Sequence, residues 1–588
     1  MITGYTNNTS VQILIALLRK HGIKRAIISP GTTNLEFAAG LQYCGEFELY
    51  SAVDERSAAY MACGMAAATK EPVIITCTEA TASRDYYPGL TEAYYRKLPV
   101  LAVTGVHRYA EIGHLQPQII DRSVSARDAL VMKVQLPIIK DKEDIWQTEI
   151  DVNKALLALR HRGGGPVHID LPCCNDDYQF DLSQLPDSRM INRYSYNDTL
   201  PVVPEGKTAI FIGSHNEFSE EETKVIDSFC GKYDGVVFCD HTSGYHGKYA
   251  VYVGLVAFQK SGFDIFNDIS LLVHIGGAAG DGPAMARFKA VQEVWRVNPD
   301  GELRDTFKKL SAVFEMEEID FFSNYADNET SADMKKEFLE KCKETTENVS
   351  IDDRKLPFSN VYIASKIAPN LPENSYIHIG VSNTIRAWTL FDFPNSVKSS
   401  SNVGCRGIDG IMSAFIGTSL VKEELCFCVL GDLTFFYDLN SLGNRSIKNN
   451  VRILLINNNS GGVMKLQGAP GYRFFGDEET DKFIAAAGHF GNKSKKLVRH
   501  FAEDLGFEYL TAENKDEFEE VYPEFVSPEN KEKPIIFETF TDATDDREAF
   551  NIASSIEVSS TGMAKELAKK LLGNTGTAKV KRFLSGKK

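Results

Sequence analysis

Residues 426–459 read CFCVLGDLTFFYDLNSLGNRSIKNNVRILLINNN, and this stretch decides the fold. Two apolar runs, CFCVL and VRILLIN, are each followed by polar residues, with Asp432 after the first and Asn458 after the second. Such runs are typical of buried strands in a parallel sheet, joined here by a helix. Because the carboxyl ends of parallel strands share one edge, the sequence predicts that Asp432 and Asn458 meet there.

A carboxylate and an amide at this edge are the oxygen ligands that a divalent ion such as Mg²⁺ prefers. We therefore predict a metal site made by Asp432, the Asn458 side chain and the backbone carbonyl of Ser460, placed to hold a diphosphate. Thr434 is expected at the start of the following helix, where free N–H groups favour a phosphate. The alternative is structural, with Asp432 an ordinary helix cap and the Asn run an ordinary turn.

Apolar runs alternate with helical patterns along most of the 588 residues, which predicts an α/β fold with doubly wound parallel sheets. Polar stretches near residues 175–206 and 324–354 separate three blocks. We predict domains at residues 1–180, 200–325 and 355–575, followed by a basic, frayed tail at 576–588 rather than a partner-binding arm. The glycine-rich loop at residues 276–282 is expected to be a plain turn, because its spacing does not match a dinucleotide fingerprint.

Composition excludes several classes of protein. The formal net charge of -16 argues against a nucleic-acid partner. The 11 cysteines are scattered without metal-ligand spacing, which indicates a reduced, cytoplasmic compartment. The N-terminal run QILIALL has no cleavage site after it, and no apolar run approaches the roughly 20 residues that span a bilayer. We therefore expect neither a signal peptide nor a membrane partner.

A second acid stands out in LYSAVDERSAAYMACGMAAA, residues 49–68. Glu55 follows a short predicted strand and opens a helix rich in alanine and glycine, of the kind that packs closely against a neighbour. Two interpretations stay open from the residues alone. Glu55 is either a charge favoured by the helix dipole or a carboxyl group held ready for a cofactor.

Several motifs together resemble the thiamine-diphosphate-dependent decarboxylase and carboligase superfamily, in its order and over most of the chain. They are SPG at 29–31, the Glu55 helix, CTEATASRDYYPGLTEAYYRKLPVLAVTG at 77–105, GPVHIDLP at 165–172, and GDL followed by NNN. One branch is especially similar: the 2-succinyl-5-enolpyruvyl-6-hydroxy-3-cyclohexene-1-carboxylate synthases of the menaquinone pathway, called the cyclohexene-carboxylate synthases below. The motifs it shares are Gly407-Ile408-Asp409-Gly410, Gly431-Asp432-Leu433, Asp438-Leu439-Asn440 and Asn457-Asn458-Asn459.

The resemblance implies pyrimidine-binding, central and diphosphate-binding domains, with active sites between the subunits of a homodimer or homotetramer. It implies thiamine diphosphate and Mg²⁺ as cofactors. Glu55 would hydrogen-bond the pyrimidine ring and activate the cofactor, and Ile408 would wedge it into a bent shape. Gln116 would lie at the reaction centre, with Gln118 as the alternative. The other implied cofactor contacts are Ser382, Gly431, Leu433 and Thr434.

The substrate side departs from the branch, which binds carboxylates through arginine and lysine. Ser382 and Arg386 are kept, but Thr32-Thr33-Asn34 replaces Ser-Arg-Ser, and Val403 replaces an arginine. Bases stand instead at Arg84, His107, Arg108, Arg406, Lys465 and Arg473. The candidate substrate residues are Thr32, Thr33, Arg84, His107, Gln116, Arg386 and Arg406.

The predicted function is decarboxylation of a 2-oxo acid and transfer of the resulting enamine to a carbonyl or alkene acceptor, with an altered substrate pocket. Three alternatives stay open: an authentic cyclohexene-carboxylate synthase, a simple 2-oxo acid decarboxylase, and a catalytically silent relative that binds the cofactor. A flavin-bearing synthase is disfavoured, because the loop at 276–282 is a weak signal for a domain that embraces FAD.

Overall fold

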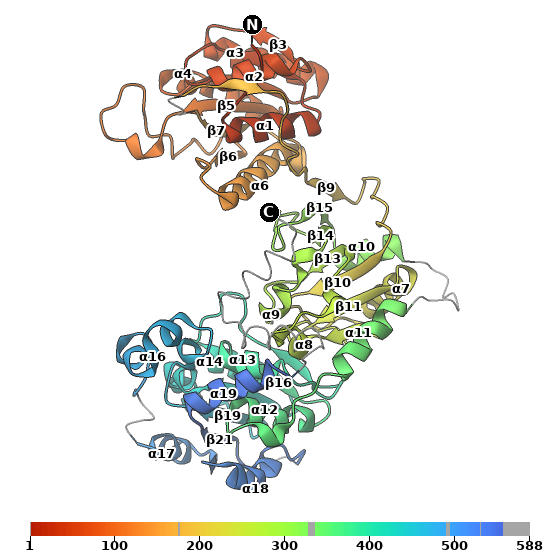
Figure 1. Ribbon diagram of the computed structural model, residues 1–588, viewed down its shortest axis with the longest axis vertical. Helices are drawn as coiled ribbons and strands as arrows, with labels where there is room; N and C mark the ends of the chain where they lie inside the picture. Colours follow the sequence, from red (N-terminus) through yellow and green to blue (C-terminus); the bar gives the residue numbers. More distant parts are fainter. Residues whose placement is uncertain are drawn as a thin grey trace, which may run out of the picture. The chain divides into compact units, whose positions relative to one another are not determined.

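The computed structural model describes residues 2–173, 177–280, 282–326, 336–489, 494–529 and 531–556 (Figure 1). It divides into an N-terminal unit, Met1–Leu200 with Asp300–Glu315, and a C-terminal unit, Pro201–Pro299 with Met316–Lys588. The tail predicted at 576–588 lies outside the described residues. The three-domain boundaries stay a prediction.

The N-terminal unit is built on a six-stranded parallel sheet with the order β3-β2-β4-β5-β7-β6. Its strands are β2 (Arg25–Ile28), β3 (Glu48–Ser51), β4 (Val73–Thr78), β5 (Val100–Val106), β6 (Met132–Gln135) and β7 (Val167–Pro172). Every residue of β5 and β7 is buried, as expected for strands covered on both faces. Two small pairs accompany this sheet: antiparallel β1 (Tyr5–Thr6) with β8 (Phe180–Leu182), and parallel β9 (Asn192–Ser195) with β15 (Leu310–Glu315).

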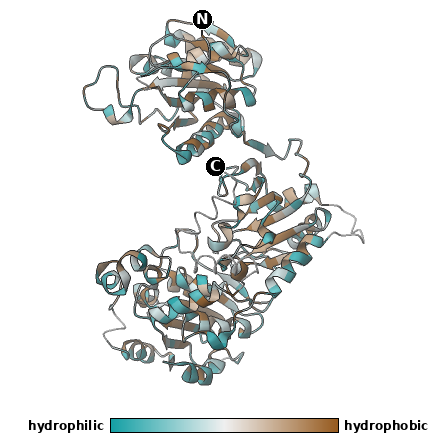
Figure 2. Cartoon of the chain, viewed as in Figure 1, coloured by the Kyte–Doolittle hydropathy of each residue, from teal (hydrophilic) through white to brown (hydrophobic). Residues whose placement is uncertain are grey.

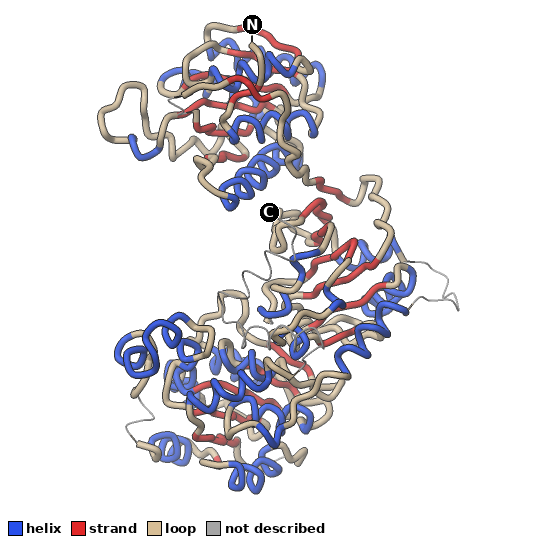
Figure 3. The backbone as a smooth tube through the Cα atoms, viewed as in Figure 1, coloured by secondary structure: helices blue, strands red, loops and turns tan. Residues whose placement is uncertain are grey.

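Helices cover both faces of this sheet (Figure 3). The helices of the unit are α1 (Thr9–Lys20), α2 (Leu35–Cys44), α3 (Glu55–Thr69), α4 (Thr81–Asp85), α5 (Tyr87–Tyr95) and α6 (Lys142–Ala158), with short 3-10 turns at Tyr109–Glu111 and His161–Gly163. Small residues let α3 and α5 pack closely. A Cβ added to Gly89 of α5 would lie only 2.4 Å from the Cβ of Ala59 in α3. Hydrophobic residues gather on the strands and the inward sides of the helices (Figure 2).

The C-terminal unit contains two parallel sheets. The first has the order β12-β11-β10-β13-β14, from β10 (Lys207–Ile212), β11 (Gly235–Cys239), β12 (Ala250–Tyr252), β13 (Ile269–Ile275) and β14 (Glu293–Val297). The second has the order β17-β16-β18-β19-β21-β20, from β16 (Tyr376–Ile379), β17 (Lys398–Ser400), β18 (Cys426–Gly431), β19 (Val451–Asn457), β20 (Glu508–Ala512) and β21 (Ile535–Phe540).

Along the described part of this unit, helices follow the strands, and the last of them, α19, comes after the final strand β21. They are α7 (Glu220–Lys232), α8 (Gly254–Phe258), α9 (Gly282–Met285), α10 (Glu318–Tyr325), α11 (Glu337–Glu347), α12 (Asn360–Ile367), α13 (Asn383–Trp388), α14 (Ile411–Leu420), α15 (Asp432–Tyr437), α16 (Pro470–Phe483), α17 (Leu497–Asp504), α18 (Lys515–Phe525) and α19 (Ala543–Ala553). Among its described residues, 3-10 turns lie at Asp264–Phe266, Phe288–Ala290, Asp353–Lys355, Ala368–Asn370, Leu439–Gly443 and Gly462–Lys465.

The predicted α/β class with parallel sheets is confirmed, and the apolar runs CFCVL and VRILLIN form neighbouring strands. The predicted helix after Asp432 begins at Asp432 itself rather than two residues later, so Thr434 lies within α15. Among the helices in the described ranges, none combines the length and apolarity that crossing a bilayer requires.

Candidate active site

Asp432 and Asn458 follow neighbouring strands of the C-terminal sheet. Strands β18 and β19 run parallel, with Gly431 opposite Ile456, so both strands deliver their next residues to the same edge. Asp432 is 7% exposed, and its Oδ1 accepts the backbone N–H of Leu433 at 2.8 Å. The pKa of Asp432 is raised to about 7, mainly by burial and also by the nearby charge of Asp546, whereas backbone hydrogen bonds from Leu433 and Asn459 lower it.

Asp546 is the residue that fixes Asn458. It lies in the first turn of α19, is 2% exposed, and accepts the Nδ2 group of Asn458 and the backbone N–H of Asn360, both at 2.7 Å. The Oδ1 atom of Asn458 instead accepts the N–H of Ser460 at 3.2 Å. This pattern sets the orientation of the amide, with its nitrogen toward Asp546 and its oxygen turned away. Burial raises the pKa of Asp546 to about 6.

The donor atoms at this edge fit a hard divalent cation such as Mg²⁺, because they are carboxylate, amide and main-chain oxygens. The Oγ of Ser460 is buried without a partner, while its carbonyl accepts the N–H of Gly462 at 2.7 Å and keeps a second lone pair. Within the described ranges, no three His, Cys, Asp or Glu side chains form a metal-binding group. A cation here would therefore depend on Asn458 and Ser460 as well as on Asp432.

The neighbouring strand end adds Ser382 and Arg386. Ser382 has a positive φ of 72°, precedes α13 and is exposed, at the end of β16 beside β18. Arg386 donates to Asn383 Oδ1 at 2.7 Å. Asn383 approaches the predicted metal ligands, because a Cβ added to Gly462 would meet both Asn383 Nδ2 at 3.2 Å and Asn458 Nδ2 at 3.1 Å. The absence of a side chain at Gly462 thus keeps this corner open.

Other predicted residues of the C-terminal unit are spread around this edge. Thr434 is buried in α15, and Leu433 is half-buried. Ile408 is partly buried and packs on the core cluster that contains Phe435. Arg406 has a positive φ of 55° and donates to the carbonyl of Ala279 at 2.6 Å, which ties it to the glycine-rich loop.

Glu55 is the first residue of α3 in the N-terminal unit. It is half-buried, and Asp54 caps the helix by accepting the N–H of Ser57 at 2.9 Å. The charge of Glu55 raises the pKa of the buried Cys77 thiol, although burial is the main cause of that shift. Glu55 therefore lies near the carboxyl end of β4, partly open to solvent.

The predicted substrate residues of this unit differ in exposure. Thr32 is exposed, whereas Thr33 is buried, its hydroxyl lacks a partner, and its carbonyl would lie 2.1 Å from a Cβ added to Gly105. His107 is half-buried and pairs with Glu79. Gln116 is exposed on the loop after β5, and no hydrogen bond joins it to Glu55, although both residues are described. The predicted roles of all these residues stay predictions.

Arg84 and Lys465 show why a base cannot be placed from sequence alone. Arg84 is exposed and donates to the carbonyl of Asp121 at 2.9 Å. Lys465 is 8% exposed and pairs with Asp481 at 2.9 Å. Arg84 remains accessible to a ligand, whereas Lys465 is held by its ion pair with Asp481.

Asp546 and Asn383 were not predicted from the sequence. Asp546 lies in TDATDDRE, which follows the apolar run PIIFETF. The same argument that selected Asp432, an acid just after a buried parallel strand, would have selected this segment. Asn383 sits directly after Ser382, at a strand end that the sequence analysis had already marked.

Comparison with known proteins identifies relatives over most of the chain. Residues 8–125 match the family model for "Thiamine pyrophosphate enzyme, N-terminal TPP binding domain". Similar proteins include the 2-succinyl-5-enolpyruvyl-6-hydroxy-3-cyclohexene-1-carboxylate synthase of Bacteroides thetaiotaomicron, 29% identical over 92% of this chain and 97% of the relative. The synthases of Flavobacterium johnsoniae and Desulfotalea psychrophila are 27% and 25% identical, over 91% and 89% of this chain and 97% and 96% of their own lengths. The chain is therefore a thiamine-diphosphate-dependent enzyme related to the cyclohexene-carboxylate synthases.

Proposed function

We propose that the enzyme uses thiamine diphosphate and Mg²⁺ to decarboxylate a 2-oxo acid and to transfer the remaining carbon unit to an acceptor. The observation that carries this proposal is the meeting of Asp432, Asn458 and Asp546 at neighbouring strand ends. Two buried acids beside an oriented amide are costly without a cation. A bound Mg²⁺ would hold Asp432 ionised and so offset that cost.

The residues of this chain divide the work between them. Asp432, Asn458 and Ser460 would hold Mg²⁺, and thiamine diphosphate, when bound, supplies the carbon nucleophile and the electron sink. By holding Nδ2 of Asn458, Asp546 would leave the Asn458 oxygen available to the metal. Glu55 would hold a proton at its carboxyl group for the pyrimidine ring. Ile408 would support the cofactor, and Gln116 and Arg386 would orient the substrate.

We also propose that the substrate pocket differs from that of the cyclohexene-carboxylate synthases. Thr33 is packed against β5 and cannot present a positive charge, and Val403 is 3% exposed within the apolar core of the C-terminal sheet. Losing one charge-assisted contact to a carboxylate costs about 1.5–3 kcal/mol, so two losses predict weak binding of that substrate. Arg84, His107 and Arg406 are the candidates for a rearranged set.

We propose a cytoplasmic homodimer or homotetramer with active sites between subunits. Exposed apolar side chains close in sequence to Glu55 and Gln116 support an interface: Val53 is 85% and Leu115 is 99% exposed. Light scattering coupled to size-exclusion chromatography measures the assembly. A stable monomer with full activity would contradict this part of the proposal.

The function is tested by incubating the purified enzyme with thiamine diphosphate, Mg²⁺ and a panel of 2-oxo acids, while CO₂ release is followed with and without carbonyl or alkene acceptors. We expect Glu55→Gln to lose activity by a factor on the order of 10²–10⁴ with its fold intact. Glu71→Gln is the matched control, because Glu71 forms only a surface ion pair with Arg160. A fully active Glu55→Gln enzyme would refute the mechanism.

The same assay separates the alternatives. Robust turnover of 2-oxoglutarate with isochorismate would identify an authentic cyclohexene-carboxylate synthase and refute the altered pocket. Release of CO₂ without any acceptor product would identify a simple decarboxylase. A silent relative would bind the cofactor without accelerating hydrogen exchange at its reactive carbon.

A further inference from the structure

The loop at residues 107–131 joins β5 to β6 and carries Gln116. Its only regular element is the 3-10 turn Tyr109–Glu111. Its tip is exposed, and Leu115 and Gln118 both have positive φ angles, of 59° and 67°. Loops of this length with little secondary structure are usually functional, and their geometry then depends on what holds their two ends.

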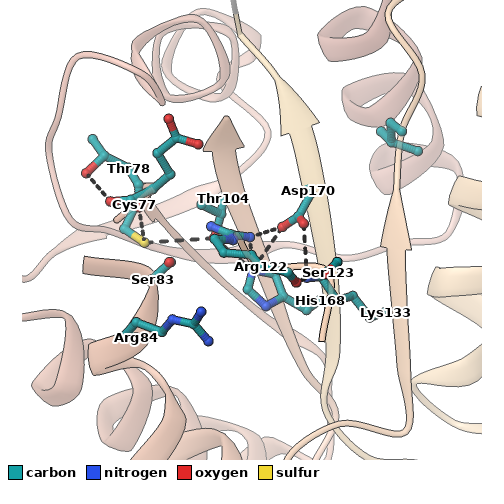
Figure 4. Close-up of polar contacts among 12 residues, drawn as sticks. Cys77, Thr78, Ser83, Arg84, Thr104, Arg122, Ser123, Lys133, His168 and Asp170 are labelled. Atoms are coloured by element: carbon teal, nitrogen blue, oxygen red, sulfur yellow. Dashed lines mark hydrogen bonds and ion pairs between the residues drawn. The ribbon is translucent and has the colours of Figure 1, made fainter. Parts of the chain in front are cut away.

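The outgoing end of the loop is held by a buried charge cluster. Arg122 is 6% exposed and lies against the sheet, where its Nη2 pairs with Asp170 of β7. Lys133 of β6 lies 3.2 Å from the same carboxylate and also donates to the backbone carbonyl of Arg122. Figure 4 shows Arg122 with Asp170 on one side and the side chains of α4 on the other. One carboxylate thus holds two cations, of which one comes from the loop and one from the sheet.

Neutral groups complete this cluster. His168 Nε2 lies 2.8 Å from Thr104 Oγ1 and 3.4 Å from Arg122 Nη2. Burial, together with the charges of Arg122 and Lys133, lowers the pKa of His168 well below its usual range, so this side chain adds no charge. Asp170 is then the nearest counter-charge for both cations. Its removal would leave the buried Arg122 and the half-buried Lys133 without their carboxylate partner.

The incoming end of the loop is held in a similar way. Glu79 is 5% exposed just after β4, and it accepts the backbone N–H of His107 at 3.3 Å while also pairing with His107 Nδ1. Arg84 of α4 adds a hydrogen bond to the carbonyl of Asp121 at 2.9 Å. One end of the loop is therefore fixed by an acid on the sheet and the other by an acid just after a strand, whereas the exposed tip between them carries Gln116.

We propose that Arg122 and Asp170 form a clamp that positions the loop at residues 107–131 for the reaction. They are positioning residues, because they act through the loop and not on the substrate. The catalytic consequence rests on the proposed function, which places Gln116 at the reaction centre. The clamp itself is a property of the N-terminal unit and can be tested without any substrate.

The test compares four variants by hydrogen–deuterium exchange and by steady-state kinetics of the full-length enzyme. In Asp170→Asn, we expect amides of residues 107–121 to exchange at least about tenfold faster, and amides of β5 and β7 to change less than about twofold. We expect kcat to fall by about 10- to 100-fold, because a displaced loop misplaces its side chains. The KM for the 2-oxo acid should change less than about threefold, because the clamp does not touch the substrate.

Two variants test the charge pairing directly. Adding Arg122→Met to Asp170→Asn removes a cation that has lost its partner, and it should bring loop exchange part of the way back toward wild type. Arg122→Lys keeps the charge without the planar fork and should give intermediate exchange and intermediate kcat. Both variants keep the proposal testable if Asp170→Asn alone folds poorly.

Asp305→Asn is the matched control in the same unit. Asp305 is also buried and pairs with an arginine, Arg189, at 2.6 Å, but it does not contact the loop. Equal loosening of the loop in this control, or wild-type exchange in Asp170→Asn, would overturn the clamp. A loosened loop with unchanged kcat would overturn its positioning role. A wild-type enzyme that releases no CO₂ would instead contradict the proposed function, and the exchange data would still decide the clamp.

Discussion

The six-stranded sheets of the two units share one topology and differ in the charges at their carboxyl edges. The N-terminal order β3-β2-β4-β5-β7-β6 and the C-terminal order β17-β16-β18-β19-β21-β20 are the same when each sheet is numbered from its own first strand. At the N-terminal edge the buried acids have basic partners, as in Asp170 with Arg122. At the C-terminal edge, Asp432 and Asp546 lie near each other, and neither forms an ion pair with a basic side chain among the described residues.

This difference separates two uses of the same scaffold. In the N-terminal unit, Asp170 and Arg122 neutralise each other and fix a loop, so these charges are already paired within the protein. The acids of the C-terminal edge have no basic partner among the described residues, and we propose that they serve a cation from outside. Burial is the main cause of both raised pKa values, with repulsion from Asp546 added for Asp432 and repulsion from Asp542 and Asp545 added for Asp546. The topology brings strand ends together in both units, but the sign of the neighbouring charges decides what each edge can bind.

The strongest way to break this comparison is Asp432→Asn. Without the carboxylate, Mg²⁺-dependent binding of thiamine diphosphate should weaken by about 4 kcal/mol, or about a thousandfold in Kd, as for the loss of one buried charged partner. The metal-free protein should be at least as stable as wild type, because repulsion with Asp546 is relieved. Calorimetric titration and thermal unfolding without metal measure the two effects, with exposed Asp409→Asn as control. Unchanged Mg²⁺ affinity would refute the metal site.

A pH experiment tests whether the C-terminal unit buries a neutral histidine at a cost to its stability. Burial lowers the pKa of His378 to about 4, from about 6.5 in the unfolded chain. Between these values only the unfolded state binds the proton, so stability falls as pH drops from 6.5 to 4, by up to about 3 kcal/mol. Exchange of β16 amides at pH 7.5 and 5 should show this loss, and His378→Asn should reduce it. The exposed His500→Asn should leave the pH dependence unchanged.

The variant Asp546→Asn tests whether Asp546 acts on metal binding through Asn458. The variant replaces an acceptor with an amide that must direct a donor toward Asn458 or Asn360, so the orientation of Asn458 is no longer fixed. We expect Mg²⁺ affinity to fall by about 10- to 100-fold, the usual effect of losing an outer-shell partner. Asp545→Asn, one residue earlier and less buried, should remain within about twofold of wild type. Equal losses in both variants would point to general charge instead of orientation.

The sequence predicted the central strands β18 and β19 of the C-terminal sheet and gave no signal for several edge strands. Strands β18 and β19 are covered on both faces, so they read as continuous apolar runs. The edge strands β6, β17 and β20 contain polar or exposed residues and gave no such signal.

The candidate site shows the same limit. Asp432 and Asn458 could be paired from sequence because one connection joins their strands, whereas Asp546 lies 88 residues beyond Asn458, and its role depends on β21 packing beside β19. Arg122 could not be distinguished from a surface base, since its burial depends on how the loop at residues 107–131 folds back on β6 and β7.

The smallest expected effect compares glycines at the two edges. At the end of β18, Gly431 has a φ of -84°, and an added Cβ would meet only the carbonyl of Ile456, at 4.0 Å. Gly431→Ala should therefore change stability by less than about 0.5 kcal/mol. Gly105→Ala is the contrasting variant, because its Cβ would lie 2.1 Å from the carbonyl of Thr33 and should cost about 1–3 kcal/mol.

Urea unfolding of both variants without metal or cofactor makes this measurement. A loss above 1 kcal/mol in Gly431→Ala would show that the C-terminal edge is packed as tightly as the N-terminal one. If its stability is unchanged, weaker binding of thiamine diphosphate to Gly431→Ala must come from the added methyl group meeting the ligand, because the protein itself leaves that space free. The variant then locates the diphosphate at the edge where the acids have no basic partner.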